Sequence, residues 1–418
     1  MRESEPRPER TQVSVAEARD IILGTVRQLV AETVSTSAAQ GRVLCEEVRS
    51  ERWIPPLDNS GMDGFALRAE DTREAPAELR VVEDLPAGRR SERKLAPGEA
   101  ARIMTGAAIP EGADAVVMQE NTEYSGNRVV VRASVEFGEN VRRAGSDVRQ
   151  GTLIASPGAV LTPAHIGMLA AIGRTTVQVT TRPRVAILAT GDELVEPDRL
   201  TDDGRIASSN SYALQAALRG VGAEPVYLGI VPDEPAALSE QFRRALACDV
   251  VISTGGVSVG DRDWIKLVLG QLGGSMQLWR VRMRPGAPLV FAMLQDRPVF
   301  GLPGNPVSTL VTFEQFVRPA LLRMMRYERV FRPVESALLA EDYNKPPGRT
   351  HFVRVMLQER EGQRYAFPTG NQSSAILLSM VRADGLAIVP EETTHVEAGT
   401  EVQVQLLARD DLRTEPGF

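Results

Sequence analysis

Acidic side chains follow three short apolar runs in the middle of the chain, at spacings that could gather them around a metal ion. The runs cover residues 185–188, 226–230 and 250–253, and the acids that follow them are Asp192, Glu193, Asp233, Asp261 and Asp263. Such runs are typical of strands buried on both faces of a parallel sheet, whose carboxyl ends meet at one edge. Hard carboxylate oxygens favour Mg²⁺. Taken singly, each acid could equally close a turn or cap a helix, as Asp233 could before Pro235.

Glycines interrupt the third run and would let a ligand approach the main chain closely. Thr254 is followed by Gly255 and Gly256, and Gly260 precedes the last two acids. Glycine reaches positive φ and carries no side chain to block a ligand. The segment matches neither a P-loop nor the dinucleotide-binding glycine pattern. A tight surface turn is the alternative interpretation.

Two arginines and a predicted helix start could supply positive charge to the same edge of the sheet. Arg280 and Arg284 lie just before a Pro-Gly pair, and arginine suits bidentate contact with phosphate or another oxyanion. Asn305 is a good N-cap and Pro306 suits a first helical position, so we expect the amides of residues 307 and 308 to face outward. Such a helix start can hold a phosphate. Several carboxylates beside a phosphate would repel it unless a divalent cation lies between them, or unless they accept hydrogen bonds from the NH groups of a ring system.

Composition excludes several broad classes of function. The chain has 418 residues, 43% of them apolar and 25% charged, with a net charge of −7. The negative charge argues against general binding to nucleic acid or to an anionic membrane. Two cysteines outside any CxxC pair and three scattered histidines predict neither a zinc site nor a disulfide scaffold. We find no signal peptide or membrane span in the sequence, so we expect a cytoplasmic protein.

From residue 184 onward, predicted strands alternate with predicted helices, which favours a doubly wound α/β domain. The strands are expected at 185–188, 226–230, 250–253, 277–283 and 298–301, and the helices at 211–219, 235–247 and 264–272. Segments rich in turns and short strands precede and follow this core. The predicted fold class is therefore multi-domain α/β plus β.

The remaining segments complete the predicted domain plan. A capping box at Ser14–Glu17 predicts a first helix, a shorter helix is expected near 38–44, and Thr162-Pro163 opens another. We expect these domains: a disordered tail at 1–12; a discontinuous helical domain of 13–50 with 142–180; an inserted β domain at 51–141; the α/β domain at 181–327; and a C-terminal, barrel-like β domain at 328–408.

Several motifs together resemble the molybdopterin molybdenumtransferases, the MoeA family, whose eukaryotic counterpart is the E domain of gephyrin. The core motifs are TGDEL at 190–194, TGGVSVGDRDW at 254–264, MRPGAP at 283–288 and GLPGNPVS at 301–308. DNSGMDGFA at 58–66, the polar segment ending at Asp147 and GNQSS at 370–374 match as well. The resemblance runs in order from residue 14 to about 408. The core alone also resembles the MogA-like adenylyltransferases.

The resemblance implies a reaction and a set of site residues. Adenylylated molybdopterin would be hydrolysed with molybdate and Mg²⁺, AMP would be released, and molybdenum would enter the dithiolene. The implied catalytic residues are Asp63, Glu193, Asp233 and Asp263, of which the last three would bind the metal. The implied substrate-binding residues are Asp58, Asp147, Thr190, Asn210, Gly255, Gly256, Ser258, Gly260, Arg280, Arg284, Gly304, Asn305 and Ser308. Arg284, Arg349 and Ser374 would hold molybdate.

The sequence departs from the family pattern at a few of these positions. Arg280 and Arg284 stand where the family often has lysines, and Ala287 stands where it often has another lysine. Ser208 replaces a common aspartate, and Ser373 replaces a glycine in the 370–374 turn. The change at Ser373 bears on how the oxyanion is held.

The resemblance also implies a homodimer whose active sites are shared between subunits. Asp58 and Asp63 would then act on the partner's cleft, whereas the alternative is that their turn only caps its own loop. Transient contacts with a MogA-like adenylyltransferase and with molybdoenzymes are expected. Two other functions remain open at this point: adenylyl transfer on the same core, and a gephyrin-like scaffold. The choice between molybdate and tungstate is also open.

Overall fold

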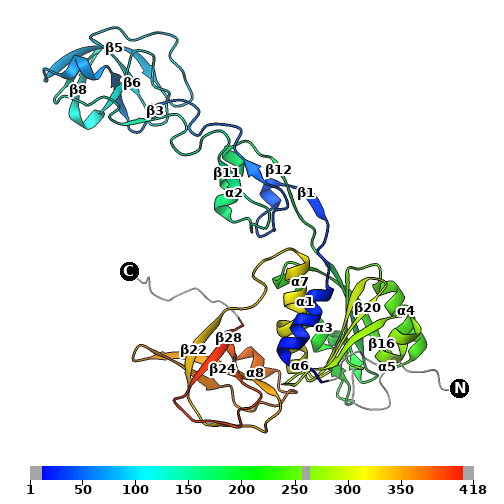
Figure 1. Cartoon of the computed structure of the whole chain (residues 1–418). Helices are drawn as coiled ribbons and strands as arrows, with labels where there is room; N and C mark the ends of the chain where they lie inside the picture. Colours follow the sequence, from blue (N-terminus) through cyan, green and yellow to red (C-terminus); the bar gives the residue numbers. More distant parts are fainter. Residues whose placement is uncertain (1–11, 257–263, 408–418) are drawn as a thin grey trace. The chain divides into compact units, whose positions relative to one another are not determined.

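The structure, a computed structural model, describes residues 12–256 and 264–407 (Figure 1). Its contacts divide the chain into two compact units. One is Ala31–Val179, and the other comprises the chain before and after that segment. The two units are described separately below.

The second unit contains the predicted α/β sheet, with strand order β16-β13-β17-β21-β20-β18. Its strands are β13 (Arg184–Thr190), β16 (Glu224–Val231), β17 (Val250–Thr254), β18 (Ser275–Arg280), β20 (Pro288–Leu294) and β21 (Arg297–Leu302). The first four in spatial order pair in parallel, whereas β20 is antiparallel to both of its neighbours. The β20 strand was not predicted from the sequence. All of β17 is buried, as its unbroken apolar run predicts.

Helices cover both faces of this sheet, which confirms the doubly wound α/β core. They are α3 (Ser209–Gly220), α4 (Pro235–Ala245), α5 (Trp264–Gln271) and α6 (Pro306–Thr312), the last continuing through a π-helical turn (Phe313–Val317) into α7 (Arg318–Met324). Alternate residues of β13 enter two different cores: Val185 packs with Leu214 of α3, and Leu188 packs with Phe242 of α4. Figure 1 shows α3 and α4 on opposite sides of the sheet.

The first helix, α1 (Val15–Thr25), begins at the predicted capping box, in which Ser14 and Glu17 bond each other's backbone. Its buried face, including Ile22, packs into the same core as α3. The expected grouping of residues 13–30 with 142–180 therefore does not hold for this helix. Its apolar stripe matches the side of the α/β sheet, and sequence order alone does not reveal that partner.

A closed β-barrel follows the α/β domain. It consists of β22 (Val334–Leu339), β24 (Thr350–Arg360), β25 (Gln363–Pro368), β26 (Gly385–Val389) and β28 (Glu401–Leu406), and the pairing of β24 with β26 closes it. Closure removes exposed strand edges. The short strand β19 (Met283–Arg284) extends from the α/β domain and pairs in parallel with the start of β24. This pairing joins the two domains next to Arg284.

The Ala31–Val179 unit contains a β-sheet and a smaller α/β piece. The sheet order is β7-β4-β6-β5-β9-β8, formed by β4 (Gly64–Leu67), β5 (Ala77–Leu85), β6 (Glu99–Ile103), β7 (Ala115–Met118), β8 (Thr122–Ser125) and β9 (Arg128–Val131). The smaller piece pairs β1 (Ala31–Ser35) with β12 (Thr176–Thr180) and β2 (Val48–Arg49) with β11 (Leu153–Ala155), beside α2 (Pro163–Ala171). The core of this smaller piece combines chain segments from before and after the β-sheet.

The short helix expected near 38–44 is absent from this unit. A single 3₁₀ turn, Thr36–Ala38, stands there instead, and Val43 and Leu44 form isolated bridges to later residues. Gly41 has a φ of 73°, which interrupts a helix at this point. Within the described residues, no helix has the length and apolarity needed to cross a membrane.

The composition of the cores predicts that residues 31–179 fold without the rest of the chain. Their three apolar cores contain only residues of this segment. A fragment of residues 31–179 should show dispersed NMR signals and a cooperative thermal transition. A longer fragment, 13–179, is the matched control: its added α1 amides should exchange rapidly, because the partners of α1 are missing. An unfolded 31–179 fragment, or a protected α1 in the longer one, would contradict this division.

Candidate functional site

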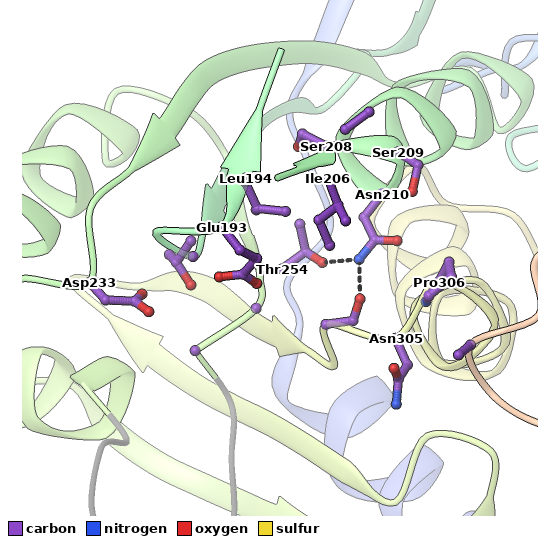
Figure 2. Close-up of a pocket in the computed structure, with 17 residues that line it drawn as sticks. Glu193, Leu194, Ile206, Ser208, Ser209, Asn210, Asp233, Thr254, Asn305 and Pro306 are labelled. Carbon is purple, nitrogen blue, oxygen red and sulfur yellow. Dashed lines mark hydrogen bonds between the residues drawn. The ribbon is translucent and has the colours of Figure 1, made fainter. Parts of the chain in front are cut away.

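A cavity of about 570 Å³ lies at the carboxyl ends of the parallel strands (Figure 2). Thr190 ends β13, Asp233 follows β16, Thr254 ends β17, and Gly304 follows β21, and all four line the cavity. The strand ends therefore converge as the sequence predicts. We call this space the acidic cavity, because Glu193 and Asp233 are its charged lining residues.

The two acids of this cavity are positioned by short local structures. β14 (Leu194–Val195) pairs with β15 (Ile206–Ala207) directly after Glu193, and the Asp233 amide donates to Asp192 Oδ1 at 3.2 Å. Figure 2 shows both carboxylates directed into the cavity. Asp192 thus organises the loop beneath Asp233. The described residues contain no group of three or more acidic, histidine or cysteine side chains placed to hold a metal.

The third predicted metal ligand, Asp263, lies outside the described residues, as do Ser258 and Gly260. The glycines before them, Gly255 and Gly256, have φ values of 90° and 65°. A Cβ on Gly255 would lie 2.2 Å from the carbonyl oxygen of Thr190, and one on Gly256 would lie 2.7 Å from Thr190 Oγ1. Both positions therefore require glycine. Thr190 Oγ1 is buried and has no hydrogen-bond partner among the described residues.

Asn210 ties two strand ends together rather than standing free for a ligand. Its Nδ2 donates to Thr254 Oγ1 at 2.9 Å and to the carbonyl oxygen of Gly304 at 2.7 Å (Figure 2). Thr254 Oγ1 in turn donates to the carbonyl oxygen of Pro303 at 3.3 Å. The amide hydrogens of Asn210 are thus used to hold the turn after β21 against the end of β17.

A second cavity, of about 530 Å³, shares Gly304 and Asn305 with the first. Its charged lining residues are Arg284, on β19, and Arg349, directly before β24. The pairing of β19 with β24 brings these two arginines together although they lie far apart in sequence. No carboxylate lines this space, and neither arginine forms a salt bridge within the part of the chain that the structure describes. We call it the arginine cavity.

Ser308 and Ser374 also line the arginine cavity, and Ser374 changes the predicted helix start. The backbone of Asn305 is extended and Pro306 begins α6, as expected, but the Asn305 side chain does not cap the helix. Its Nδ2 donates instead to Ser374 Oγ at 3.1 Å, and the Val307 amide donates to the Ser374 carbonyl at 3.1 Å. The prediction of an outward, available amide at residue 307 was therefore wrong, because the turn of the barrel docks there.

Arg280 does not join the other predicted basic residue. It ends β18, opposite Pro288, and lies in neither lining set. The strand expected at 277–283 is in fact divided between β18 and β19, with a tight loop closed by a bond from the Val281 amide to the Ala287 carbonyl. On one continuous strand, two arginines four residues apart would lie on the same face. Because the strand is broken between them, Arg280 and Arg284 do not share a face of one strand.

In the Ala31–Val179 unit, the carboxylates of Asp58 and Asp63 both accept loop hydrogen bonds. Asp58 accepts from the Ala144 amide at 2.7 Å and from Arg143 Nη1 at 2.6 Å, and these bonds lower its pKa in that order of effect. Asp63 Oδ1 accepts from the hydroxyl and the amide of Thr105, both at 2.7 Å, and these bonds lower its pKa. The bonds are those that a loop-capping role requires.

Asp147 belongs to the same connection as Asp58. Its amide donates to the Ile54 carbonyl at 3.0 Å, and the Gly145 amide donates to the Pro55 carbonyl at 2.9 Å. The segments around 54–58 and 143–147 thus lie side by side, and the Asp147 side chain is exposed.

Comparison with known proteins agrees with this domain order. Residues 13–173 match the MoeA N-terminal region (domain I and II), residues 186–323 match a probable molybdopterin binding domain, and residues 336–407 match the MoeA C-terminal region (domain IV). A molybdopterin molybdenumtransferase of Nostoc sp. is 40% identical over 406 residues, covering 94% of this chain and 93% of the relative. The chain belongs to the MoeA family.

Other MoeA relatives extend the match. The molybdopterin molybdenumtransferase of Bacillus subtilis is 36% identical over 414 residues, covering 96% of each chain. The crystal structure of a molybdopterin biosynthesis MoeA protein from Pyrococcus horikoshii superposes with a TM-score of 0.81 at 31% identity, covering 94% of this chain and 99% of that one. Sequence and fold therefore agree over nearly the whole length.

Two buried residues behind the arginine cavity of this MoeA chain were not predicted from the sequence. Arg354 is 1% exposed, its Nη2 donates to the Ser373 carbonyl at 3.2 Å, and burial lowers its pKa to about 10. His351 is 4% exposed and bonds the Tyr343 hydroxyl at 2.9 Å, and burial lowers its pKa to about 4. His351 is therefore neutral at physiological pH. A cation inside the apolar run 352–357 was the available signal for Arg354.

Of the positions that depart from the expected MoeA pattern, all except Arg280 line one of the two cavities. Ser208 is buried, its hydroxyl bonds Ser211 Oγ at 2.8 Å, and it lines the acidic cavity. Ala287 lines the arginine cavity, as does Ser373, whose carbonyl is the acceptor for Arg354. The positive lining charge of the arginine cavity therefore comes from Arg284 and Arg349 alone within the described residues.

Two neighbouring glycines that line the acidic cavity should respond differently to alanine. Gly255→Ala introduces both a positive-φ penalty and a backbone clash, so it should destabilise the protein by roughly 1–3 kcal/mol and lower its Tm. Gly304→Ala is the matched control, because φ is not positive there and its Cβ would meet only Gly255 Cα at 3.7 Å. Its Tm should equal that of the wild type. Equal Tm values for both variants, measured by circular dichroism, would contradict the geometry of the glycine loop.

Proposed function

We propose that this chain is a molybdopterin molybdenumtransferase, an enzyme that inserts molybdenum from molybdate into molybdopterin during molybdenum cofactor biosynthesis. Family membership and the molybdopterin-binding domain match support this assignment. The observation that carries it is the placement of two cavities on either side of Gly304 and Asn305. One cavity presents carboxylates, and the other presents two arginines without an acidic partner among the described residues.

The acidic cavity would take the phosphoanhydride of adenylylated molybdopterin. Glu193 and Asp233 offer hard oxygen ligands that fit Mg²⁺, and Asp263 would complete the set. Bound Mg²⁺ would neutralise phosphate charge and polarise the phosphoryl oxygens. Glycines 255 and 256 leave the main chain open to the ligand, and the buried hydroxyl of Thr190 is available to donate a hydrogen bond. Hydrolysis of the phosphoanhydride there would release AMP.

The arginine cavity would hold molybdate. Arg284 and Arg349 offer guanidinium groups that match an oxyanion with two parallel hydrogen bonds each, and Ser374 offers a hydroxyl. Because His351 is neutral near pH 7, its protonation does not alter the charge of this cavity in the physiological range. The substrate thiolates would receive the metal, since neither cysteine of the chain lines either cavity.

Two rival functions are less well supported. An adenylyltransferase on the same core would not account for the MoeA domains matched on both sides of that core. A pure scaffold has no use for two carboxylates directed into a cavity. Comparing AMP turnover from ATP plus molybdopterin with that from adenylylated molybdopterin separates the first rival from the proposed reaction.

Neutralising either cavity acid should remove Mg²⁺-dependent AMP release. We expect Glu193→Gln and Asp233→Asn each to lower the rate of AMP release roughly 10²–10³-fold, because each removes a negative charge that would hold Mg²⁺. Asp198→Asn is the matched control, since this exposed acid lies on the 3₁₀ turn Pro197–Arg199 outside the cavity. Turnover by both cavity variants at the wild-type rate, with adenylylated molybdopterin as substrate, would refute the assignment of these acids.

We also propose that the enzyme acts in the cytoplasm as a homodimer whose sites are shared, with Asp58 and Asp63 serving the partner's acidic cavity. Both hydrogen bonds from Thr105 reach Oδ1 of Asp63, so among the described residues its second oxygen remains for a ligand. A two-fold dimer uses the same surface on both partners, so each inserted β-sheet could serve the other subunit.

Mixed dimers test the shared site. Asp63→Ala and Glu193→Ala chains carrying different tags should each be inactive as homodimers, and their purified heterodimer should regain one intact site. About half of the wild-type activity is expected if the two sites are independent. A heterodimer as inactive as both parents would show that Asp63 acts within its own chain.

A further inference from the structure

Lys345 is a buried lysine that the proposed reaction does not use directly. It is 6% exposed and follows the short strand β23 (Tyr343–Asn344), which pairs with β27 (His395–Val396). Its Nζ donates to three backbone carbonyls: Pro346 at 3.3 Å, Arg349 at 3.0 Å and Glu391 at 3.0 Å. An ammonium group has three N–H donors, and here each has one acceptor. It forms no salt bridge to a carboxylate within the described residues.

The contacts of Lys345 fix the loop that ends at Arg349. The sequence from residue 345 is Lys-Pro-Pro-Gly-Arg, and its two prolines have no amide to donate. Gly348 has a φ of 89°, and its amide donates to the Glu391 carbonyl at 3.0 Å. The Lys345 amide donates to the Thr394 carbonyl at 2.8 Å. The amides of Lys345 and Gly348 therefore hold the loop against the 391–394 segment. The Lys345 ammonium donates to carbonyls of both the loop and that segment.

The Lys345 ammonium fixes the backbone of Arg349, whose side chain belongs to the arginine cavity. Arg349 lines that cavity, and its side chain is exposed. The positive charges of Lys345, Arg284 and Arg349 all act on His351, adding to the effect of burial in lowering its pKa. The buried ammonium thus lies within electrostatic reach of the same buried imidazole as both cavity arginines.

We propose that Lys345 is a positioning residue for the oxyanion: it holds the 346–349 loop so that the Arg349 guanidinium is preorganised in the arginine cavity. The inference rests on the proposed function of that cavity. A rigid loop reduces the entropy lost when Arg349 binds an anion, so the benefit appears in anion affinity rather than in the chemical step. A merely structural lysine would instead stabilise the barrel without a specific link to Arg349.

A double-mutant cycle distinguishes these roles. The steady-state KM for molybdate and kcat are measured for the full-length dimer, using release of AMP, in Lys345→Met, Arg349→Ala and the double variant. We expect Lys345→Met to raise the molybdate KM about tenfold with kcat at saturating molybdate changed by less than about twofold. In the Arg349→Ala background, which itself raises this KM, the same substitution should have little further effect, because the residue it positions is already gone.

Matched variants keep the result interpretable. Val404→Ala removes buried volume from β28, a barrel strand that pairs with β22 and β26 but not with β24, so it should lower Tm without raising the molybdate KM. If Lys345→Met does not fold, Lys345→Gln, which retains part of the donor set, enters the same cycle. Lys345→Arg should raise the molybdate KM as Lys345→Met does, because a planar guanidinium cannot place three donors on these carbonyls.

The outcomes separate this inference from the proposed function. Independent, multiplicative effects of the Lys345 and Arg349 substitutions would overturn the positioning role, and so would an unchanged KM in Lys345→Met. An unchanged molybdate KM in Arg349→Ala would instead show that the arginine cavity does not hold the oxyanion, which refutes the proposed function of that cavity and with it the inference.

Discussion

The turn at Gly304 and Asn305 is the constraint on which the rest of the site depends. Asn210 Nδ2 holds its acidic-cavity side through the Gly304 carbonyl at 2.7 Å, and Asn305 Nδ2 holds its arginine-cavity side through Ser374 Oγ at 3.1 Å. Each bond contributes only about 1 kcal/mol to stability. Together they connect α3, the end of the sheet and the barrel, so the two cavities keep a common wall and a fixed relationship.

Charge is segregated across this wall. Glu193 and Asp233 face one space, whereas Arg284 and Arg349 face the other, and the strand pairing of β19 with β24 keeps the arginines together. A substrate could therefore place its metal-bridged phosphoanhydride beside the carboxylates while the oxyanion lies beside the arginines. In this arrangement the oxyanion is kept away from the carboxylates, and the metal ion is kept away from the arginines. The placement follows from topology, since the acids end parallel strands and the arginines flank the junction with the barrel.

The sequence predicts the parts of the site that depend on strand period and chain order. The apolar runs at 185–188 and 226–230 fall in β13 and β16, and because parallel strands end at one edge, Glu193 and Asp233 line the same cavity, as expected. Contacts between distant segments could not be predicted in this way. Asn305 resembles a helix cap, but its side-chain amide donates instead to the Ser374 hydroxyl, 69 residues away in the sequence. Lys345 lies in a turn-like Pro-Pro-Gly segment, and only the folded barrel buries its ammonium. Val15–Thr25 forms the predicted helix, yet its partner is set by tertiary packing.

The central claim is that the oxyanion and the phosphoanhydride occupy opposite sides of the Gly304–Asn305 turn. Anomalous diffraction at the molybdenum absorption edge, from crystals of the full-length protein soaked in molybdate, tests it most directly. The account predicts a molybdenum peak in the cavity lined by Arg284, Arg349 and Ser374. A peak beside Glu193 and Asp233, with none between the arginines, would contradict it.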